Sequence, residues 1–309
     1  MADLSVKLAG VAFKNPIIPA SGAFGFGREY EKFYPLSRLG GISVKGMTLN
    51  PKDGNPPPRI AETPAGMLNS VGLQNPGIDY FLEHELPNLA GKDTVIIANV
   101  AGGTVEDCVE IARRIEGTSV DMIELNISCP NVKEGGVAFG VDPRMAAGIT
   151  GAVRAVSSKP LMVKLSPNVT DITVIARAVE SAGADAVSLI NTILGMRIDI
   201  NTRRPVLKQN VGGLSGPAVF PVAVRMVWQV ANAVKIPVCG MGGVSRWQDA
   251  VEMMMAGATA VQVGAALFAN PMAPVEIIEG MDRYLNENGI LHISDLIGSV
   301  QPYGKESCN

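Results

Sequence analysis

The sequence predicts an α/β protein built as a single (β/α)8 barrel, and three observations indicate this fold class. Short apolar runs alternate with longer segments of helical period, the order expected of a parallel sheet assembled from βα units. There are eight such runs, the number of strands in a closed barrel. The length of 309 residues fits one barrel of ~250 residues with insertions, so we expect one domain over residues 1–309. A doubly wound open sheet is the alternative.

The strands are expected in β-rich segments that are apolar on both faces. In chain order these segments are 16–20, 41–45, 94–100, 122–127, 161–165, 186–190, 237–239 and 260–263. Helical patterns lie between them, as at 105–115 and 171–182, and in the second pattern Ile172, Ile175 and Val179 share one face. The opening stretch 4–13, with a turn at Ala9-Gly10, predicts a hairpin that plugs the amino-terminal end of the barrel.

Two connections, 46–92 after the second strand and 191–236 around the seventh helix, are too long for ordinary loops. Loops beyond ~15 residues usually carry function or structure of their own. Both follow the carboxyl end of a strand, the face on which barrels place their chemistry. We therefore expect two insertions at the active face, and we assign no role to the segment 208–211 within the second.

The composition restricts the classes of function. Hydrophobic residues make up 47% and charged residues 18%, which excludes disorder and collagen-like structure, and the net charge of −3 disfavours nucleic acid or a membrane as the main partner. The amino terminus has no basic start followed by an apolar block, so a soluble, cytoplasmic protein is expected. The four cysteines form no C-x-x-C, so we expect no metal site, and the two histidines lie away from any candidate nucleophile.

Polar side chains gather where the apolar strands stop. They are Lys45, Asn99, Asn126, Lys164, Asn191 and Thr192. Buried lysines and amides are costly without partners, so their convergence predicts a polar ligand. An asparagine offers both a donor and an acceptor and matches the imide edge of a flavin or a pyrimidine, while a lysine suits a carboxylate or a reduced flavin.

The last two strands are followed by glycine-rich loops, Gly240-Met-Gly242-Gly243 and Gly264-Ala265-Ala266. Free backbone N–H groups after strands seven and eight form the usual phosphate site of a barrel, which predicts a phosphorylated cofactor. Two tight turns without a ligand are the alternative. The fourth strand leads into a loop with Cys129, and a thiol pKa near 8.5 suits a base that removes a weakly acidic proton.

Six segments add specificity to this interpretation. They are Asn15-Pro-Ile-Ile-Pro-Ala-Ser21-Gly-Ala-Phe-Gly-Phe-Gly27, Val44-Lys45-Gly46, Asn69-Ser-Val-Gly-Leu-Gln-Asn-Pro-Gly77, Asn126-Ile-Ser-Cys-Pro-Asn131, Asn191-Thr-Ile-Leu-Gly-Met196 and Gly212-Gly-Leu-Ser-Gly-Pro217. Together they resemble the dihydroorotate dehydrogenase family in its class 1, type B (NAD-linked) form, over about residues 4–298.

The resemblance implies a barrel with FMN at its mouth and assigns residues to each ligand. For FMN the implied contacts are Ser21, Lys45, Gly46, Asn99, Asn126, Lys164, Ile190, Gly216, Gly242, Gly243, Gly264 and Ala265. For dihydroorotate they are Lys45, Asn69, Ser70, Val71, Gly72, Leu73, Asn126, Asn191 and Thr192. Cys129 would be the catalytic base that removes a proton next to the ring carbonyl, while a hydride leaves the neighbouring carbon for the flavin.

The implied activity is the oxidation of dihydroorotate to orotate in de novo pyrimidine (UMP) biosynthesis. The chain has no Rossmann fingerprint and no cysteine cluster. The resemblance therefore implies a partner subunit with FAD and a [2Fe–2S] cluster, in a heterotetramer of two catalytic and two electron-transfer subunits, which passes electrons to NAD. The alternatives are the flavin-barrel part of a dihydropyrimidine dehydrogenase, which typically has His where this chain has Asn131, and a non-catalytic flavin- or phosphate-binding barrel.

Overall fold

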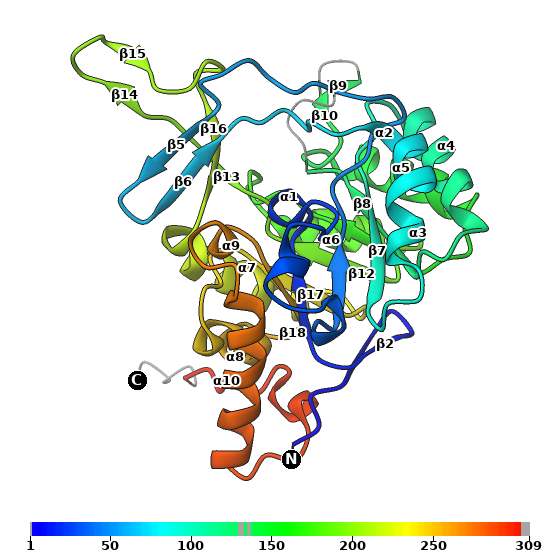
Figure 1. Cartoon of the computed structure of the whole chain (residues 1–309), viewed down its shortest axis with the longest axis vertical. Coiled ribbons are helices and arrows are strands. Elements are labelled where there is room, and N and C mark those ends of the chain that lie inside the picture. The colour runs from blue at the N-terminus through cyan, green and yellow to red at the C-terminus, as the bar shows by residue number, and fades with distance from the viewer. Residues whose placement is uncertain (1, 129–132, 135–136, 304–309) are drawn as a thin grey trace, which may run out of the picture.

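Eight parallel strands pair in one sheet, and its two outer strands, β3 and β4, lie against each other, so the sheet is a nearly closed barrel (Figure 1). The computed structural model describes residues 2–128, 133–134 and 137–303. The strands, in the order in which they pair, are β3 (Ile17–Pro19), β18 (Ala258–Val263), β17 (Val238–Met241), β12 (Ala186–Leu189), β11 (Leu161–Lys164), β8 (Met122–Asn126), β7 (Val95–Val100) and β4 (Gly41–Ser43). The eight predicted strands and the barrel are confirmed.

These strands form because nearly every position in them is buried, on the barrel interior or against the surrounding helices. Three predicted boundaries are wrong by two residues: β4 ends at Ser43 and not at Lys45, and β18 begins at Ala258 and not at Ala260. The third is the end of β17, which continues through Gly240, paired with β12 and β18, and Met241, paired with β18. Gly240 is therefore a strand residue and not part of a loop. A Cβ there would lie 2.5 Å from Cγ of Met253, so glycine is required for the helix to pack closely against the strand.

Helices surround the barrel and bury one face each. The long ones are α4 (Val105–Glu116), α5 (Pro143–Arg154), α6 (Ile172–Ser181), α7 (Phe220–Ala231), α8 (Trp247–Met255) and α10 (Ala273–Glu287). Both predicted helices are confirmed as α4 and α6, and in α6 Ile172, Ile175 and Val179 are buried as expected. Among the described helices, none is both long and apolar enough to cross a membrane.

The predicted hairpin is confirmed as β1 (Val6–Leu8) and β2 (Val11–Phe13), which pair antiparallel. Its turn residues Ala9 and Gly10 have φ angles of 49° and 85°. Phe13 packs against Gly41, the first residue of β4, and both are buried. The hairpin therefore lies at the amino-terminal end of the barrel, opposite the face that carries the site.

The two long connections contain further strands, and four of these form one sheet. The first connection carries β5 (Ile60–Thr63), β6 (Gly66–Asn69), α2 (Gly77–Tyr80), a π-helix (Phe81–Glu85) and α3 (Leu86–Leu89). The second carries β13 (Ile193–Gly195), β14 (Ile198–Asp199), β15 (Arg204–Pro205), β16 (Gly212–Ser215) and a 3-10 turn (Pro217–Val219). The order β13-β16-β6-β5 joins them in a four-stranded antiparallel sheet, and Figure 1 shows the β14–β15 hairpin projecting beyond it.

The remaining elements are short. They are α1 (Ser21–Phe24) after β3, α9 (Ala266–Ala269) after β18, the pair β9 (Lys133–Glu134) and β10 (Val137–Ala138), and 3-10 turns at Tyr30–Lys32, Leu36–Arg38 and Ile293–Leu296. Of these, α1 and α9 follow the carboxyl ends of neighbouring barrel strands. Both therefore lie at the face where the barrel opens.

Candidate active site

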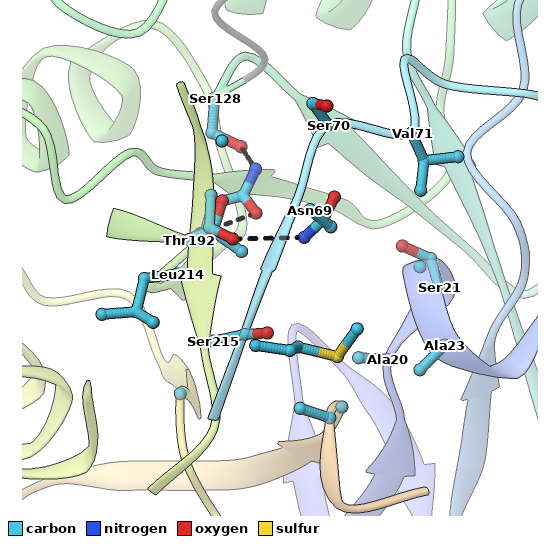
Figure 2. A pocket seen from close by; sticks show the side chains of 18 of the residues that line it. Ala20, Ser21, Ala23, Asn69, Ser70, Val71, Ser128, Thr192, Leu214 and Ser215 are labelled. Atoms are coloured by element: carbon cyan, nitrogen blue, oxygen red, sulfur yellow. Dashed lines mark hydrogen bonds between the residues drawn. The ribbon is translucent and has the colours of Figure 1, made fainter. Parts of the chain in front are cut away.

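A cavity of about 530 Å³ opens at the carboxyl ends of the barrel strands and beneath the four-stranded sheet. This volume lies within the range of ~300–1,000 Å³ typical of cofactor and substrate pockets. Figure 2 shows Asn69, Thr192 and Ser128 gathered on one side of the cavity and Ser21 of α1 on the other. The barrel and both long connections therefore contribute to one site.

Every described residue of the predicted set lines this cavity. They are Ser21, Lys45, Gly46, Asn69, Ser70, Val71, Gly72, Leu73, Asn99, Asn126, Lys164, Ile190, Asn191, Thr192, Gly216, Gly242, Gly243, Gly264 and Ala265. Cys129 lies outside the described residues. The residue before it in the chain, Ser128, lines the cavity. The structure thus brings the set together, while the ligand that each residue binds stays a prediction.

Two lysines line the cavity from different strands. Lys164 ends β11 and is 6% exposed, and Lys45 lies two residues beyond β4. Within the described part of the chain, neither ammonium group makes a hydrogen bond or an ion pair. Both ammonium groups are therefore left able to donate hydrogen bonds to acceptor atoms of a ligand in the cavity. Burial, and then the charge of Arg59, lowers the pKa of Lys45.

Beneath the cavity floor lies a carboxylate that the sequence analysis missed. Glu124 of β8 is fully buried and accepts hydrogen bonds from Asn99 Nδ2 at 2.6 Å and from Ser43 Oγ at 2.8 Å. Its other oxygen accepts from Ser188 Oγ at 2.8 Å and from Gln262 Nε2 at 2.7 Å. Burial by itself raises the pKa of Glu124, but the charge of Lys164 and these hydrogen bonds outweigh it and lower that pKa. Glu124 is therefore ionised inside the barrel.

Amide side chains above this floor bond to one another. Asn126 Nδ2 donates to Asn99 Oδ1 at 3.5 Å, and Asn126 Oδ1 accepts from Ser128 Oγ at 2.6 Å. Asn191 Nδ2 donates to the same Ser128 oxygen at 2.6 Å. At the mouth, Asn69 Nδ2 donates to the carbonyl of Gly213 at 3.4 Å. The amides that face the ligand are thus held by partners from several strands.

The glycines after the last two strands leave backbone exposed to the cavity. Gly242 and Gly243 have φ angles of 124° and 77°, and a Cβ on Gly243 would lie 2.8 Å from the carbonyl oxygen of Gly216. At Gly264 a Cβ would meet only Ala20, at 3.7 Å, and the short helix α9 follows. These loops, the unpartnered lysines and the paired amides fit FMN, because its phosphate accepts from backbone N–H groups and its imide edge pairs with amides.

Several residues that line the cavity had no role in the sequence analysis. Gln209 and Val211 belong to the segment to which no role was assigned, and both line the mouth. Asn55 donates to the carbonyl of Ser70 at 2.9 Å, which fixes the loop 69–73. Asn168 donates to the carbonyl of Thr192 at 3.0 Å. Their partners are distant in sequence, so no local pattern indicates them.

The other described cysteines and the histidines lie away from the cavity lining. Burial raises the pKa of the Cys108 thiol to about 12 and also raises that of Cys239, so neither thiol is a ready base near neutral pH. The side chains of His84 and His292 are both exposed. His84 lies in the last turn of the π-helix Phe81–Glu85.

The chain matches the family model described as dihydroorotate dehydrogenase over residues 3–285. It is 55% identical over 299 residues to "dihydroorotate dehydrogenase B (NAD(+)), catalytic subunit" of Thermoanaerobacter pseudethanolicus, covering 97% of this chain and 99% of the relative. The protein of the same name from Lachnoclostridium phytofermentans is 56% identical, and the match covers 97% of this chain and 100% of the relative.

Solved structures agree with the fold. A DHODH of Eimeria tenella, crystallised in complex with ferulenol, superposes with a TM-score of 0.77 over 96% of this chain and 88% of its own. Its sequence identity to this chain is 23%. At that identity the similarity supports the barrel architecture alone.

Proposed function

The chain belongs to the dihydroorotate dehydrogenase family, and on that basis we propose that it is the catalytic subunit of an NAD-linked enzyme that oxidises dihydroorotate to orotate with FMN in the cavity at the barrel mouth. The observation that carries this proposal is the pair of cations, Lys45 and Lys164, which line one cavity and make no hydrogen bond or ion pair in the described chain. A carboxylate substrate supplies an acceptor for one of these cations, and a flavin supplies an acceptor for the other.

The proposed roles follow from the position of each group. Lys45 pairs with the substrate carboxylate, while the loop 69–73 and the amides of Asn126 and Asn191 hold the substrate ring. Lys164, at the floor, stabilises negative charge on the flavin ring, and the glycines after β17 and β18 face its phosphate. When bound, FMN supplies the acceptor for the hydride that leaves the substrate ring. Asn126 is proposed to contact both the substrate and FMN.

We propose Cys129 as the base that removes the proton next to the ring carbonyl. The position of Ser128, the residue before it in sequence, on the cavity wall supports this role. General base catalysis typically contributes ~10²- to 10⁴-fold. The variant Cys129→Ala is therefore expected to lose about that factor in the rate of flavin reduction while it keeps its FMN.

The matched control is Cys108→Ala, which removes a buried thiol in α4, away from the cavity. This variant is expected to reduce its flavin at the rate of the unmodified protein. Stopped-flow absorbance of the flavin measures both rates. Equal rates for Cys129→Ala and the unmodified protein would rule out the thiol as the base.

The choice of substrate separates this function from that of a dihydropyrimidine dehydrogenase. Dihydrouracil has no carboxylate, so it leaves the cation of Lys45 without a partner. We expect turnover of dihydroorotate to exceed that of dihydrouracil by at least ~100-fold, because an unpaired buried group costs several kcal/mol. Comparable turnover of the two compounds would favour the alternative.

We further propose that electrons leave the flavin through a partner subunit with FAD and a [2Fe–2S] cluster, in a heterotetramer of two catalytic and two electron-transfer subunits. The name of the bacterial relatives, a catalytic subunit of an NAD(+) enzyme, supports a separate electron-transfer subunit. We place the complex in the cytoplasm. The free thiols of Cys108 and Cys239 suit a reducing compartment.

A further inference from the structure

Glu124 is the meeting point of hydrogen bonds from four other barrel strands. Its donors are Ser43 of β4, Asn99 of β7, Ser188 of β12 and Gln262 of β18, and all four are fully buried. Side chains from these strands meet only on the barrel axis. Glu124 does not itself line the cavity, but Asn99, which donates to it, does.

A directional chain of hydrogen bonds runs from the mouth of the cavity to this carboxylate. Asn191 donates to Ser128 (2.6 Å), Ser128 to Asn126 (2.6 Å), Asn126 to Asn99 (3.5 Å) and Asn99 to Glu124 (2.6 Å). In each link the donor is the residue farther from Glu124, and the acceptor is an oxygen of the residue nearer to it. Three of these residues are amides that line the cavity.

We propose that Glu124 is a positioning residue that sets the direction of this chain and so decides which face each amide presents to the bound ligands. An amide can turn either its oxygen or its nitrogen toward a neighbour, whereas an ionised carboxylate only accepts. Asn99 must therefore point its nitrogen at Glu124, which leaves its oxygen to accept from Asn126, and the order continues outward. The inference rests on the proposed function for the identity of the ligands.

The orientation of the Gln262 amide is further evidence that the carboxylate of Glu124 determines how its neighbours turn. Its Nε2 donates to Glu124, while in the described part of the chain its own buried Oε1 has no hydrogen-bond partner. Buried acceptors without partners are rare in native proteins. The side chain adopts this orientation because the reverse one would place an oxygen against the carboxylate. The lowered pKa of Glu124 agrees, because it keeps the carboxylate ionised.

The test compares FMN binding to apoprotein variants that differ in what they offer Asn99. In Glu124→Gln, the new side-chain nitrogen can face Ser188 and, after the amide of Gln262 rotates by 180°, the oxygen of Gln262. The new side-chain oxygen then still accepts from Asn99, so we expect FMN affinity within about threefold of that of the unmodified protein. Glu124→Met offers no strong acceptor, and we expect FMN affinity to fall roughly tenfold or more. Equal losses in both variants would overturn the proposal, because they would assign the effect to charge and not to direction.

Ser188→Ala is the structural control. It removes a hydrogen bond to the other oxygen of Glu124 at an equally buried position outside the cavity lining. We expect it to lower the midpoint of thermal unfolding while FMN affinity stays unchanged. If Glu124→Met and Ser188→Ala both lose FMN affinity in proportion to their loss of stability, Glu124 has a structural role only.

Ser128→Ala tests the chain without a change in the barrel interior, and so applies even if Glu124→Met does not fold. It separates Asn191 from Asn126 but leaves Asn99 bonded to Glu124. We expect orotate, titrated against the flavin absorbance of the holoprotein, to bind roughly tenfold more weakly while FMN affinity is kept. Unchanged orotate affinity would overturn the proposal. An unmodified apoprotein that binds no FMN would instead contradict the proposed function.

Discussion

Lys45 illustrates how single charges define this site. Its ammonium lies on the cavity wall, where burial, and then the charge of Arg59, lowers its pKa from the ordinary value of 10.5. A lysine whose pKa is lowered loses its proton as the pH rises through that lower value. Because only the charged form attracts a carboxylate, we expect orotate affinity to decline at a lower pH than an unperturbed lysine would allow.

The contribution of Arg59 can be isolated by two substitutions. Arg59→Gln removes the neighbouring charge, so the pKa of Lys45 rises and the alkaline decline in orotate affinity moves to higher pH. Arg59→Lys keeps the charge, so we expect orotate affinity to decline at nearly the same pH as in the unmodified protein. Orotate titrations of the holoprotein between neutral and alkaline pH measure both. A decline that does not move in Arg59→Gln would mean that another group causes it.

Among single residues, those that line the cavity could be predicted from the sequence better than the buried residues that hold them in place. Lys45, Asn126 and Lys164 could be identified because each polar residue follows an apolar run. Glu124 could not, since it lies within a strand and its four donors are spread along the sequence from Ser43 to Gln262. Only closure of the barrel brings them together. Buried polar networks of this kind leave no local pattern in a sequence.

At the scale of elements, the sheet formed by the two long connections shapes the mouth of the cavity. β6 pairs with β16, and Asn69 lies opposite Gly213, which is 144 residues away in sequence. A Cβ at Gly213 would lie 2.0 Å from Oγ1 of Thr192. Gly213 therefore allows two ligand-facing side chains, Asn69 and Thr192, to approach the same strand.

The variant Gly213→Ala tests this arrangement. The added methyl group must displace Thr192, so we expect KM for dihydroorotate to rise at least ~10-fold, while FMN, for which we propose no contact with Thr192, remains bound. Gly148→Ala in α5 is the control, because a Cβ there meets no atom within 4 Å. It is expected to keep normal kinetics and to gain up to ~1 kcal/mol of stability from helix propensity. Normal KM in Gly213→Ala would contradict the role of the sheet.

The sequence predicted the strands of the barrel and missed those of the sheet above it, for a physical reason. Strands buried on both faces, such as β7 and β11, begin with continuous apolar runs. By contrast, β16 is Gly-Gly-Leu-Ser and β6 is Gly-Met-Leu-Asn, which are too short and too rich in glycine to show an alternating pattern. Their pairing depends on the barrel that holds the two connections together.

At the scale of the whole molecule, the proposed function places both a substrate and a flavin in one cavity, and the electrons must then leave it. We expect the isolated chain with FMN to be reduced by dihydroorotate but not to reduce NAD at the rate of the complete enzyme. Addition of the electron-transfer subunit is expected to restore NADH formation, measured by its absorbance. Full-rate NAD reduction by the isolated chain would contradict the proposed partner. The organisation of residues 1–309 as one domain stays a prediction.

The most direct test of the central claim is an anaerobic titration of the FMN-loaded protein with dihydroorotate, followed by the visible absorbance of the flavin. We predict that the yellow colour is bleached with a stoichiometry of one dihydroorotate per flavin, with release of one orotate. A flavin that stays oxidised in excess dihydroorotate, or a protein that cannot be loaded with FMN, would contradict the proposal that this cavity joins the two ligands.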